Sequence, residues 1–284
     1  MLVWILLVLR GVGAQRLCGD CFCIPGADGV CPSEVPKTDF SDLVPALRSF
    51  VDTTPFSIDC DPYLNETCTT SPPQGTTGVC VLDIPDECPG NYSTYTFEGT
   101  LEEALARNLP VTHASPCGAC SSLQDLAVYM EIGSELRQSS TQCGFRGVIN
   151  ADDGVECFRE LGFSESCAQI WFFNTRQTST QCGSLCAPFA LSGDPPNGPA
   201  PECALAECLE CDETQSGPVF SRVSGRTRRN SGLLSDIVRG CDEIVYLDQI
   251  DPCLIVNPPE PTASGAAVIS LVMLTTLVNV LLLF

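Results

Sequence analysis

Basic residues are scarce in this sequence. Its 284 residues contain 14 lysines and arginines against 35 aspartates and glutamates, which gives a formal net charge of −21. Nucleic acid is therefore excluded as a partner, because its phosphates repel so acidic a chain. Histidine occurs once, at His113, and the cysteines lack the paired spacing of zinc fingers. We therefore expect no metal site and no cofactor.

Cysteine is abundant instead. Twenty cysteines in one chain are more than a reducing cytosol allows, which predicts disulfides and an oxidising compartment. Their number is even, as complete pairing requires. Eight of them precede a boundary near Glu98 and 12 follow it. Even counts on both sides indicate two modules, each held together by its own disulfides.

Both ends of the chain are apolar. Residues 1–14 have the apolar run and the small residues of a signal peptide, with cleavage expected after Ala14. Residues 256–265 form an expected proline-rich stalk, and residues 266–284 carry no charge. This last segment is either a hydrophobic membrane helix or the signal for a glycosylphosphatidylinositol (GPI) anchor. Both alternatives place the body at the extracellular face of the cell membrane, tethered through its C-terminus.

The segments between these ends predict a mainly α, disulfide-rich fold. Residues 15–98 are rich in Pro, Thr, Asp and Gly, which indicates a small irregular module that depends on its cysteines. Residues 99–255 carry helix signals. A capping box begins at Thr100, and Ser122 and Ser164 precede apolar residues at helical spacing. We expect a larger, helical C-terminal module there.

An internal repeat lies within the second module. Residues 137–144 read RQSSTQCG and residues 176–183 read RQTSTQCG, so seven of eight positions match. Each copy follows a predicted helix. The match predicts a duplicated unit, a helix followed by a cysteine corner, with Cys143 and Cys182 in equivalent roles.

One cysteine motif has a spacing used in catalysis. Cys117-Gly118-Ala119-Cys120 follows a predicted strand and opens a predicted helix, an order in which the helix N-terminus stabilises a thiolate. The segment resembles a thioredoxin-type active site. That resemblance implies Cys117 as nucleophile and Cys120 as resolving thiol. The alternative is structural pairing of both cysteines, with each other or elsewhere, because such spacings arise freely in a cysteine-rich chain.

Arginines gather near the end of the second module. Guanidinium groups bind carboxylate, phosphate or sulfate through paired hydrogen bonds. On a helix, Arg222, Arg226 and Arg229 would share one face, because they are spaced at i, i+4 and i+7. We expect a binding site for an anionic glycan or an acidic protein, unless the arginines pair with the chain's own acids. The run from 226 to 229 also matches the R-x-R-R pattern cut by secretory proprotein convertases. The candidate binding residues are Arg222, Arg226, Arg228 and Arg229.

Two glycosylation sequons fall in the first module, at Asn65 and Asn91. Together these features favour a membrane-tethered extracellular glycoprotein with a binding or structural role at the cell surface. The alternative is a secretory-pathway thiol–disulfide oxidoreductase that uses Cys117 and Cys120.

Overall fold

The computed structural model describes residues 19, 21–73, 75–84 and 88–256. The predicted signal peptide, nearly all of the stalk and the hydrophobic segment 266–284 lie outside these residues. Within the described ranges, no helix combines the length and the apolar character needed to cross a bilayer.

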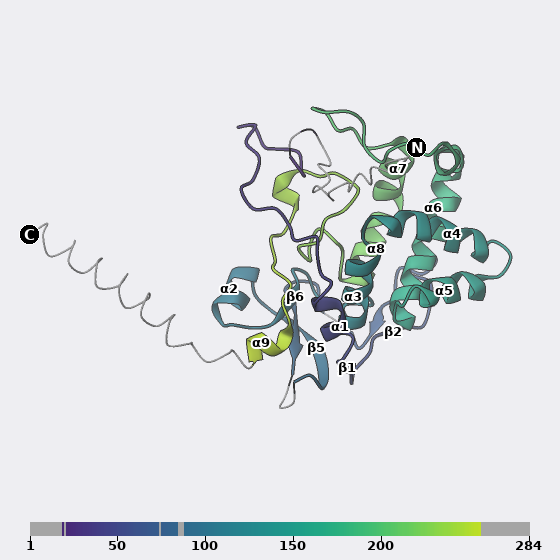
Figure 1. Cartoon of the computed structure of the whole chain (residues 1–284). Coiled ribbons are helices and arrows are strands. Elements are labelled where there is room, and N and C mark those ends of the chain that lie inside the picture. Colours follow the sequence, from purple (N-terminus) through teal and green to yellow (C-terminus); the bar gives the residue numbers. More distant parts are fainter. Residues whose placement is uncertain (1–18, 20, 74, 85–87, 257–284) are drawn as a thin grey trace, which may run out of the picture.

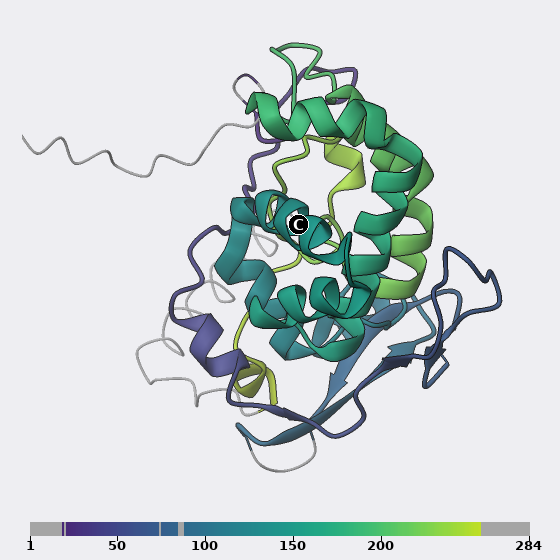
Figure 2. The ribbon, with the colours of Figure 1, turned by 90° about the vertical axis from the view of Figure 1, so that its right-hand side faces the viewer.

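A four-stranded mixed sheet lies at the lower end of the molecule in Figures 1 and 2. The strand order is β1 (Val51–Asp52), β5 (Asn91–Phe97), β4 (Val79–Asp83) and β6 (Val111–His113). β1 runs parallel to β5, whereas β5 and β6 both run antiparallel to β4. A separate antiparallel pair joins β2 (Ser57–Ile58) to β3 (Thr70–Ser71).

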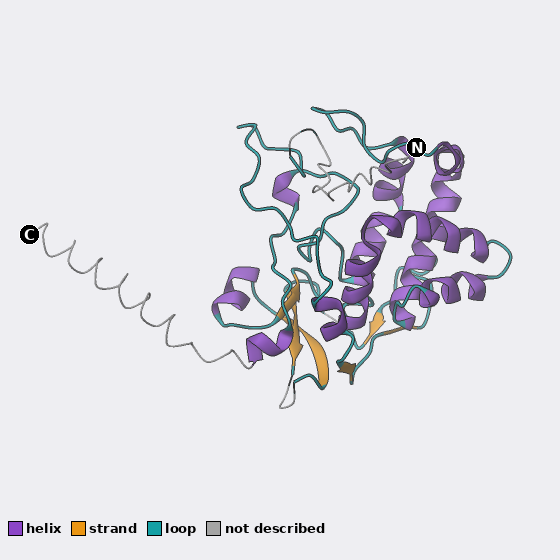
Figure 3. Ribbon diagram, viewed as in Figure 1, coloured by secondary structure: helices purple, strands orange, loops and turns teal. Residues whose placement is uncertain are grey.

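Helices lie to either side of this sheet in Figure 3, and the longer ones extend away from it. The longest, α6, packs against α4, α5, α7 and α8. Two short 3-10 helices cover Gly133–Glu135 and Cys241–Glu243. The α-helices are α1 (Leu43–Leu47), α2 (Leu101–Ala106), α3 (Leu123–Ile132), α4 (Leu136–Gly147), α5 (Ala151–Glu160), α6 (Glu165–Ser192), α7 (Glu207–Gln215), α8 (Gly217–Ser224) and α9 (Pro252–Val256).

Side-chain caps start several helices where the sequence predicts them. At α2 the Thr100 hydroxyl accepts from the backbone N–H of Glu103 at 3.2 Å, and the Glu103 carboxylate accepts from the backbone N–H of Thr100 at 2.9 Å. Ser122 caps α3 and Ser164 caps α6, each through its hydroxyl oxygen. These caps satisfy N–H groups that the first helical turn leaves without a partner.

The expectation of a mainly α fold is wrong, because β1, β4, β5 and β6 build a mixed sheet and β2 and β3 build a second one. The sequence of β4, which pairs with both β5 and β6, shows no alternation of apolar and polar residues. Four of its five residues are buried, on both faces of the sheet. A strand covered on both faces lacks the period of two that marks a half-buried strand.

The disulfides also join the two predicted modules. Nine disulfides form among the described residues, and three of them cross the boundary near Glu98: Cys23–Cys241, Cys80–Cys117 and Cys88–Cys253. The expectation that each module is stapled separately is therefore wrong. Disulfide bonding this extensive is consistent with a protein of the secretory pathway or the extracellular space.

One hydrophobic core spans the same boundary. Leu47 of α1 and Tyr92 of β5 lie in it together with Leu126 of α3 and Phe172 of α6. The aromatic ring of Trp171 lies 4.7 Å from that of Phe220, measured between ring centroids. The irregular N-terminal segment thus shares the apolar core of the helical part instead of relying on its cysteines alone.

The two repeat copies lie inside helices, 137–144 in α4 and 176–183 in α6. The predicted cysteine corner is absent at both. Each repeated cysteine is bonded to the helix that comes next in the chain, Cys143 to Cys157 of α5 and Cys182 to Cys211 of α7. The two cysteines therefore have equivalent roles, since each joins its helix to the next helix in the chain. The unit is a pair of disulfide-linked helices and not the predicted helix followed by a cysteine corner.

Candidate ligand-binding cavity

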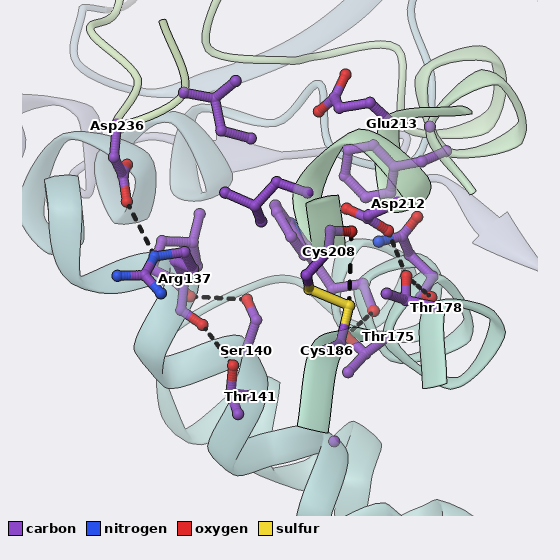
Figure 4. Close-up of a pocket in the computed structure, with 18 of the residues that line it drawn as sticks. Arg137, Ser140, Thr141, Thr175, Thr178, Cys186, Cys208, Asp212, Glu213 and Asp236 are labelled. Carbon is purple, nitrogen blue, oxygen red and sulfur yellow. Dashed lines mark hydrogen bonds and ion pairs between the residues drawn. A yellow bond between two sulfur atoms is a disulfide. The ribbon is translucent and has the colours of Figure 1, made fainter. Parts of the chain in front are cut away.

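A cavity of about 490 Å³ lies between α4, α6, α7, α8 and the loop that follows α8 (Figure 4). Ligand pockets in proteins span roughly 300–1,000 Å³. Aromatic and aliphatic side chains form much of its wall, among them Tyr129, Leu136, Trp171, Leu209, Phe220 and Ile237.

The two repeat copies supply hydroxyl groups on facing walls of this cavity. On α4, Ser140 donates to the carbonyl of Leu136 at 2.7 Å and Thr141 donates to that of Arg137 at 3.0 Å. On α6, Ser179 of the second copy donates to the carbonyl of Thr175 at 2.9 Å, and Thr175, which directly precedes that copy, donates to the carbonyl of Trp171 at 2.9 Å. A hydroxyl has one proton, so each of these groups can only accept a hydrogen bond from a ligand.

Arg137 and Arg228 share one carboxylate at one side of the cavity. Asp236 Oδ1 lies 2.7 Å from Nη1 of Arg228, and Asp236 Oδ2 lies 3.8 Å from Nε of Arg137. Neither Nε atom has a hydrogen-bond partner within the described residues, although both atoms are buried. This group therefore carries one excess positive charge and has unused donors, which is the chemistry that binds an anion.

Four further charged residues form a linear chain of ion pairs, separate from Arg137, Arg228 and Asp236. Arg229 lies 3.5 Å from Glu243, and Glu243 lies 3.8 Å from Arg239, which also pairs with Glu213. Two guanidinium groups and two carboxylates cancel one another, so this chain adds no net charge to the cavity.

Asp212 stands apart from these pairs. The hydroxyl of Thr178 donates to its Oδ1, and Ser216 and Asn174 also hydrogen-bond to its carboxylate. No lysine or arginine of the described chain lies within ion-pair distance of it. Burial, followed by the nearby negative charge of Glu213, raises the pKa of Asp212 above its ordinary value.

The predicted arginine site is divided by the structure. Helix α8 ends at Ser224, so Arg222, Arg226 and Arg229 do not share a helical face. Arg222 is exposed on α8, whereas Arg226 is completely buried. Arg228 and Arg229 line the cavity, but each pairs with an acid of the chain. Of the four candidate binding residues, Arg228 and Arg229 line the cavity, and anion binding by them stays a prediction.

Arg226 holds distant segments together. Its Nε donates to the carbonyl of Cys120 at 2.9 Å, its Nη1 donates to that of Thr112 at 2.8 Å, and its Nη2 donates to that of Ser121 at 3.1 Å. Burial lowers the pKa of Arg226 to about 10, which leaves it charged at neutral pH. With Arg226 enclosed in this way, the R-x-R-R pattern is not presented to a protease in the folded protein.

The cysteines of the C-x-x-C motif are not bonded to each other. Cys117 pairs with Cys80 of β4, and Cys120 pairs with Cys167 of α6. Both are buried. The structure therefore lacks the Cys117–Cys120 disulfide that a thioredoxin-type mechanism requires, and it gives both cysteines structural partners.

Both sequon asparagines are exposed. The side-chain oxygen of Asn65 accepts from the backbone N–H of Thr67 at 3.0 Å and from its hydroxyl at 2.8 Å. Asn91 begins β5 at the edge of its register with β1. Their glycosylation stays a prediction. In the described ranges no cluster of acidic, cysteine and histidine side chains could hold a metal ion.

Sequence reasoning missed several charged residues of the cavity, among them Arg137, Asp212 and Asp236. Arg137 is the first residue of the repeated octapeptide, so the repeat itself carried a signal that was interpreted only as structural. Asp212 and Asp236 lie in no motif. Asp212 and Asp236 reach the cavity only because α7 and the loop after α8 lie beside α6 and α4 in the folded chain.

Comparison with known proteins matches one part of the chain. The model of a family described as "Family of unknown function (DUF8771)" matches residues 151–247, which is less than half of the sequence. This stretch contains α6, α7, α8 and the arginine-bearing loop, whereas α4 lies outside it. Neither the curated proteins nor the solved structures contain a match.

Proposed function

We propose that this protein is a membrane-tethered extracellular binding protein whose cavity holds a small amphipathic ligand. The observation that carries the proposal is the cavity itself. It has the volume of a ligand site, an apolar wall around Trp171, and charged groups at its edges. Apolar surface that the helices leave uncovered gains free energy when a ligand removes it from water.

The tether and the compartment rest on the disulfides and on the sequence. Nine disulfides among the described residues support an oxidising environment. The uncharged segment 266–284 supports attachment to the membrane, by a helix or a GPI anchor.

The ligand carries an acidic group. Arg137 and Arg228 share Asp236 and retain unused Nε donors. This arrangement supports a carboxylate or phosphate on a small molecule more than it supports a large anionic glycan or an acidic protein, because Arg137 and Arg228 line a cavity. The oxidoreductase alternative has no such support, since Cys117 and Cys120 are held in separate disulfides.

A single tryptophan allows a direct test. Trp4 lies in the predicted signal peptide, so Trp171 is the one tryptophan of the expected mature chain, and it lines the cavity. Dodecanoate, added below its critical micelle concentration, should change Trp171 fluorescence saturably. Gly183 lines the same cavity, and a Cβ added there meets nothing within 4 Å. Gly183→Leu should therefore take up part of the cavity and weaken dodecanoate binding at least about tenfold.

Gly183→Ala is the matched control, because it changes the same position but adds only one carbon. It should bind dodecanoate within about threefold of the wild type. Equal binding by the wild type and Gly183→Leu would place the ligand elsewhere. No saturable binding by the wild type, either of dodecanoate or of its ω-amino derivative, would refute the proposed function.

A further inference from the structure

The charges around the cavity are unevenly distributed. Arg137 and Arg228 share Asp236, which leaves one positive charge in excess. The ion-pair chain from Arg229 to Glu213 is neutral. Asp212 then remains as a negative charge without a cation among the described residues. Figure 4 shows Asp236 and Arg137 on one side of the cavity and Asp212 with Thr178 on the other, with apolar side chains between them.

A carboxylate in the position of Asp212 is costly to the empty protein. It is partly withdrawn from water, and its hydrogen bonds come from neutral groups, chiefly the hydroxyl of Thr178. Removing a carboxylate from water without an opposite charge is unfavourable. A cation delivered by a ligand would compensate this charge, which no basic residue of the described chain does.

The polar wall near Asp212 fits a donor and not an acceptor. Thr175 donates its proton to the carbonyl of Trp171, and Thr178 donates its proton to Asp212. Their oxygens therefore present lone pairs alone. An ammonium group has three N–H donors and no acceptor, and it complements both this wall and the carboxylate.

We infer that the ligand is dipolar: its ammonium group binds Asp212, its acidic group binds Arg137 and Arg228, and an apolar segment lies between them against Trp171. This inference rests on the proposed function and names the chemical class of its ligand. Because each end of the cavity has an excess charge of one sign, a molecule with both groups gains at both ends.

The test compares three probes of equal chain length: ω-aminododecanoate, dodecanoate and dodecylamine. Binding is measured by calorimetry, with Trp171 fluorescence as the reporter of cavity occupancy. Wild-type protein should bind ω-aminododecanoate at least about tenfold more tightly than dodecanoate. The shorter ω-aminohexanoate, measured against hexanoate, tests whether the preference depends on the span between the two ends.

The variant Asp212→Asn keeps an oxygen that can accept from Thr178 but loses the charge. It should bind ω-aminododecanoate and dodecanoate equally, with its dodecanoate affinity unchanged. Glu213→Gln is the matched control, because this neighbouring carboxylate already pairs with Arg239, and it should keep the preference.

Three outcomes separate the two proposals. A preference for ω-aminododecanoate that disappears in Asp212→Asn and persists in Glu213→Gln supports the dipolar ligand. Dodecanoate binding without any preference in the wild type overturns the dipolar ligand and leaves the proposed function standing. No binding of any probe overturns both. The wild-type comparison decides the matter even if Asp212→Asn fails to fold.

Discussion

Two arginines only two positions apart in the sequence lie in opposite environments. Arg226 is completely buried and donates to three backbone carbonyls and two hydroxyls. Arg228 borders the cavity, shares its carboxylate with Arg137 and has an Nε without a partner in the described chain. The first arginine has used its donors within the protein, whereas the second has a donor left.

The packing of the main chain also differs between the region around Arg226 and the cavity wall. Beside Arg226, a Cβ added to Gly118 would lie 2.5 Å from the carbonyl oxygen of Val223, so the two segments touch through their main chains. At one position of the cavity wall, Gly183, an added Cβ meets nothing within 4 Å. Close packing and complete hydrogen bonding mark the first region as structural. Open space and unused donors mark the second as a place for something else to bind.

The largest effect is expected at Arg226. Arg226→Met removes the donors to the carbonyls of Thr112, Cys120 and Ser121, all of which are buried, and it should lower the free energy of unfolding by at least about 3 kcal/mol. Urea denaturation with the disulfides intact measures this change. Arg137→Met is the matched control at the cavity. Its ion pair is partly exposed, so its cost should stay within about 1 kcal/mol.

Equal losses for Arg226→Met and Arg137→Met would contradict this division into a structural and a binding region. So would a folded Arg226→Met protein of wild-type stability.

A second effect concerns pH and the structural region. Asp125 is buried at the start of α3, where it accepts from the backbone N–H of Ser164 at 2.8 Å. Burial raises the pKa of Asp125 to about 6. The folded protein therefore holds this proton more tightly than the unfolded chain does. The proton on Asp125 therefore adds about 3 kcal/mol to the free energy of unfolding below about pH 4, the pKa of the unfolded chain. This contribution is lost as the pH rises through about 6.

Asp125→Asn tests this prediction because the amide resembles the protonated acid. Between about pH 4 and pH 7 its free energy of unfolding should decrease by about 3 kcal/mol less than that of the wild type, and the decrease that remains comes from other carboxyls with a raised pKa, such as Asp212. Asp212→Asn serves as the comparison at the cavity. If the wild type and Asp125→Asn lose stability in parallel over this range, then another group is responsible.

Local signals in the sequence predicted local structure well. Thr100, Ser122 and Ser164 cap helices as expected, because a cap depends on residues within one turn of it. The sheet could not be found in the same way. Its central strand β4 pairs with β5 and β6, and all but one of its residues are buried. Nothing within the strand reveals which partners cover it.

The candidate site was predictable only in part. The arginine cluster drew attention to Arg228 and Arg229, which do line the cavity. The environment of Arg226 depends on carbonyls more than a hundred positions earlier, at Thr112 and Cys120, so composition and spacing could not distinguish it from its neighbours. Asp212 is a candidate because no basic residue of the described chain pairs with it, and that depends on the folded structure.

The smallest effect compares the two repeat copies directly. Gly144 and Gly183 occupy the same position of the repeated octapeptide, and both lie inside a helix. A Cβ on Gly183 meets nothing, so Gly183→Ala should raise the free energy of unfolding by about 0.5–1 kcal/mol through helix propensity. A Cβ on Gly144 would lie 2.4 Å from the methyl carbon of Thr175.

Thr175 cannot easily move away, because its hydroxyl is bonded to the carbonyl of Trp171. Gly144→Ala should therefore lower the free energy of unfolding, although the two glycines occupy the same position of the repeated octapeptide. Thermal unfolding of both variants, with the disulfides intact, measures the difference. A gain in stability at both positions would mean that α4 and α6 separate more readily than the contact at Thr175 indicates, and that the cavity wall is less rigid than the structural region around Arg226.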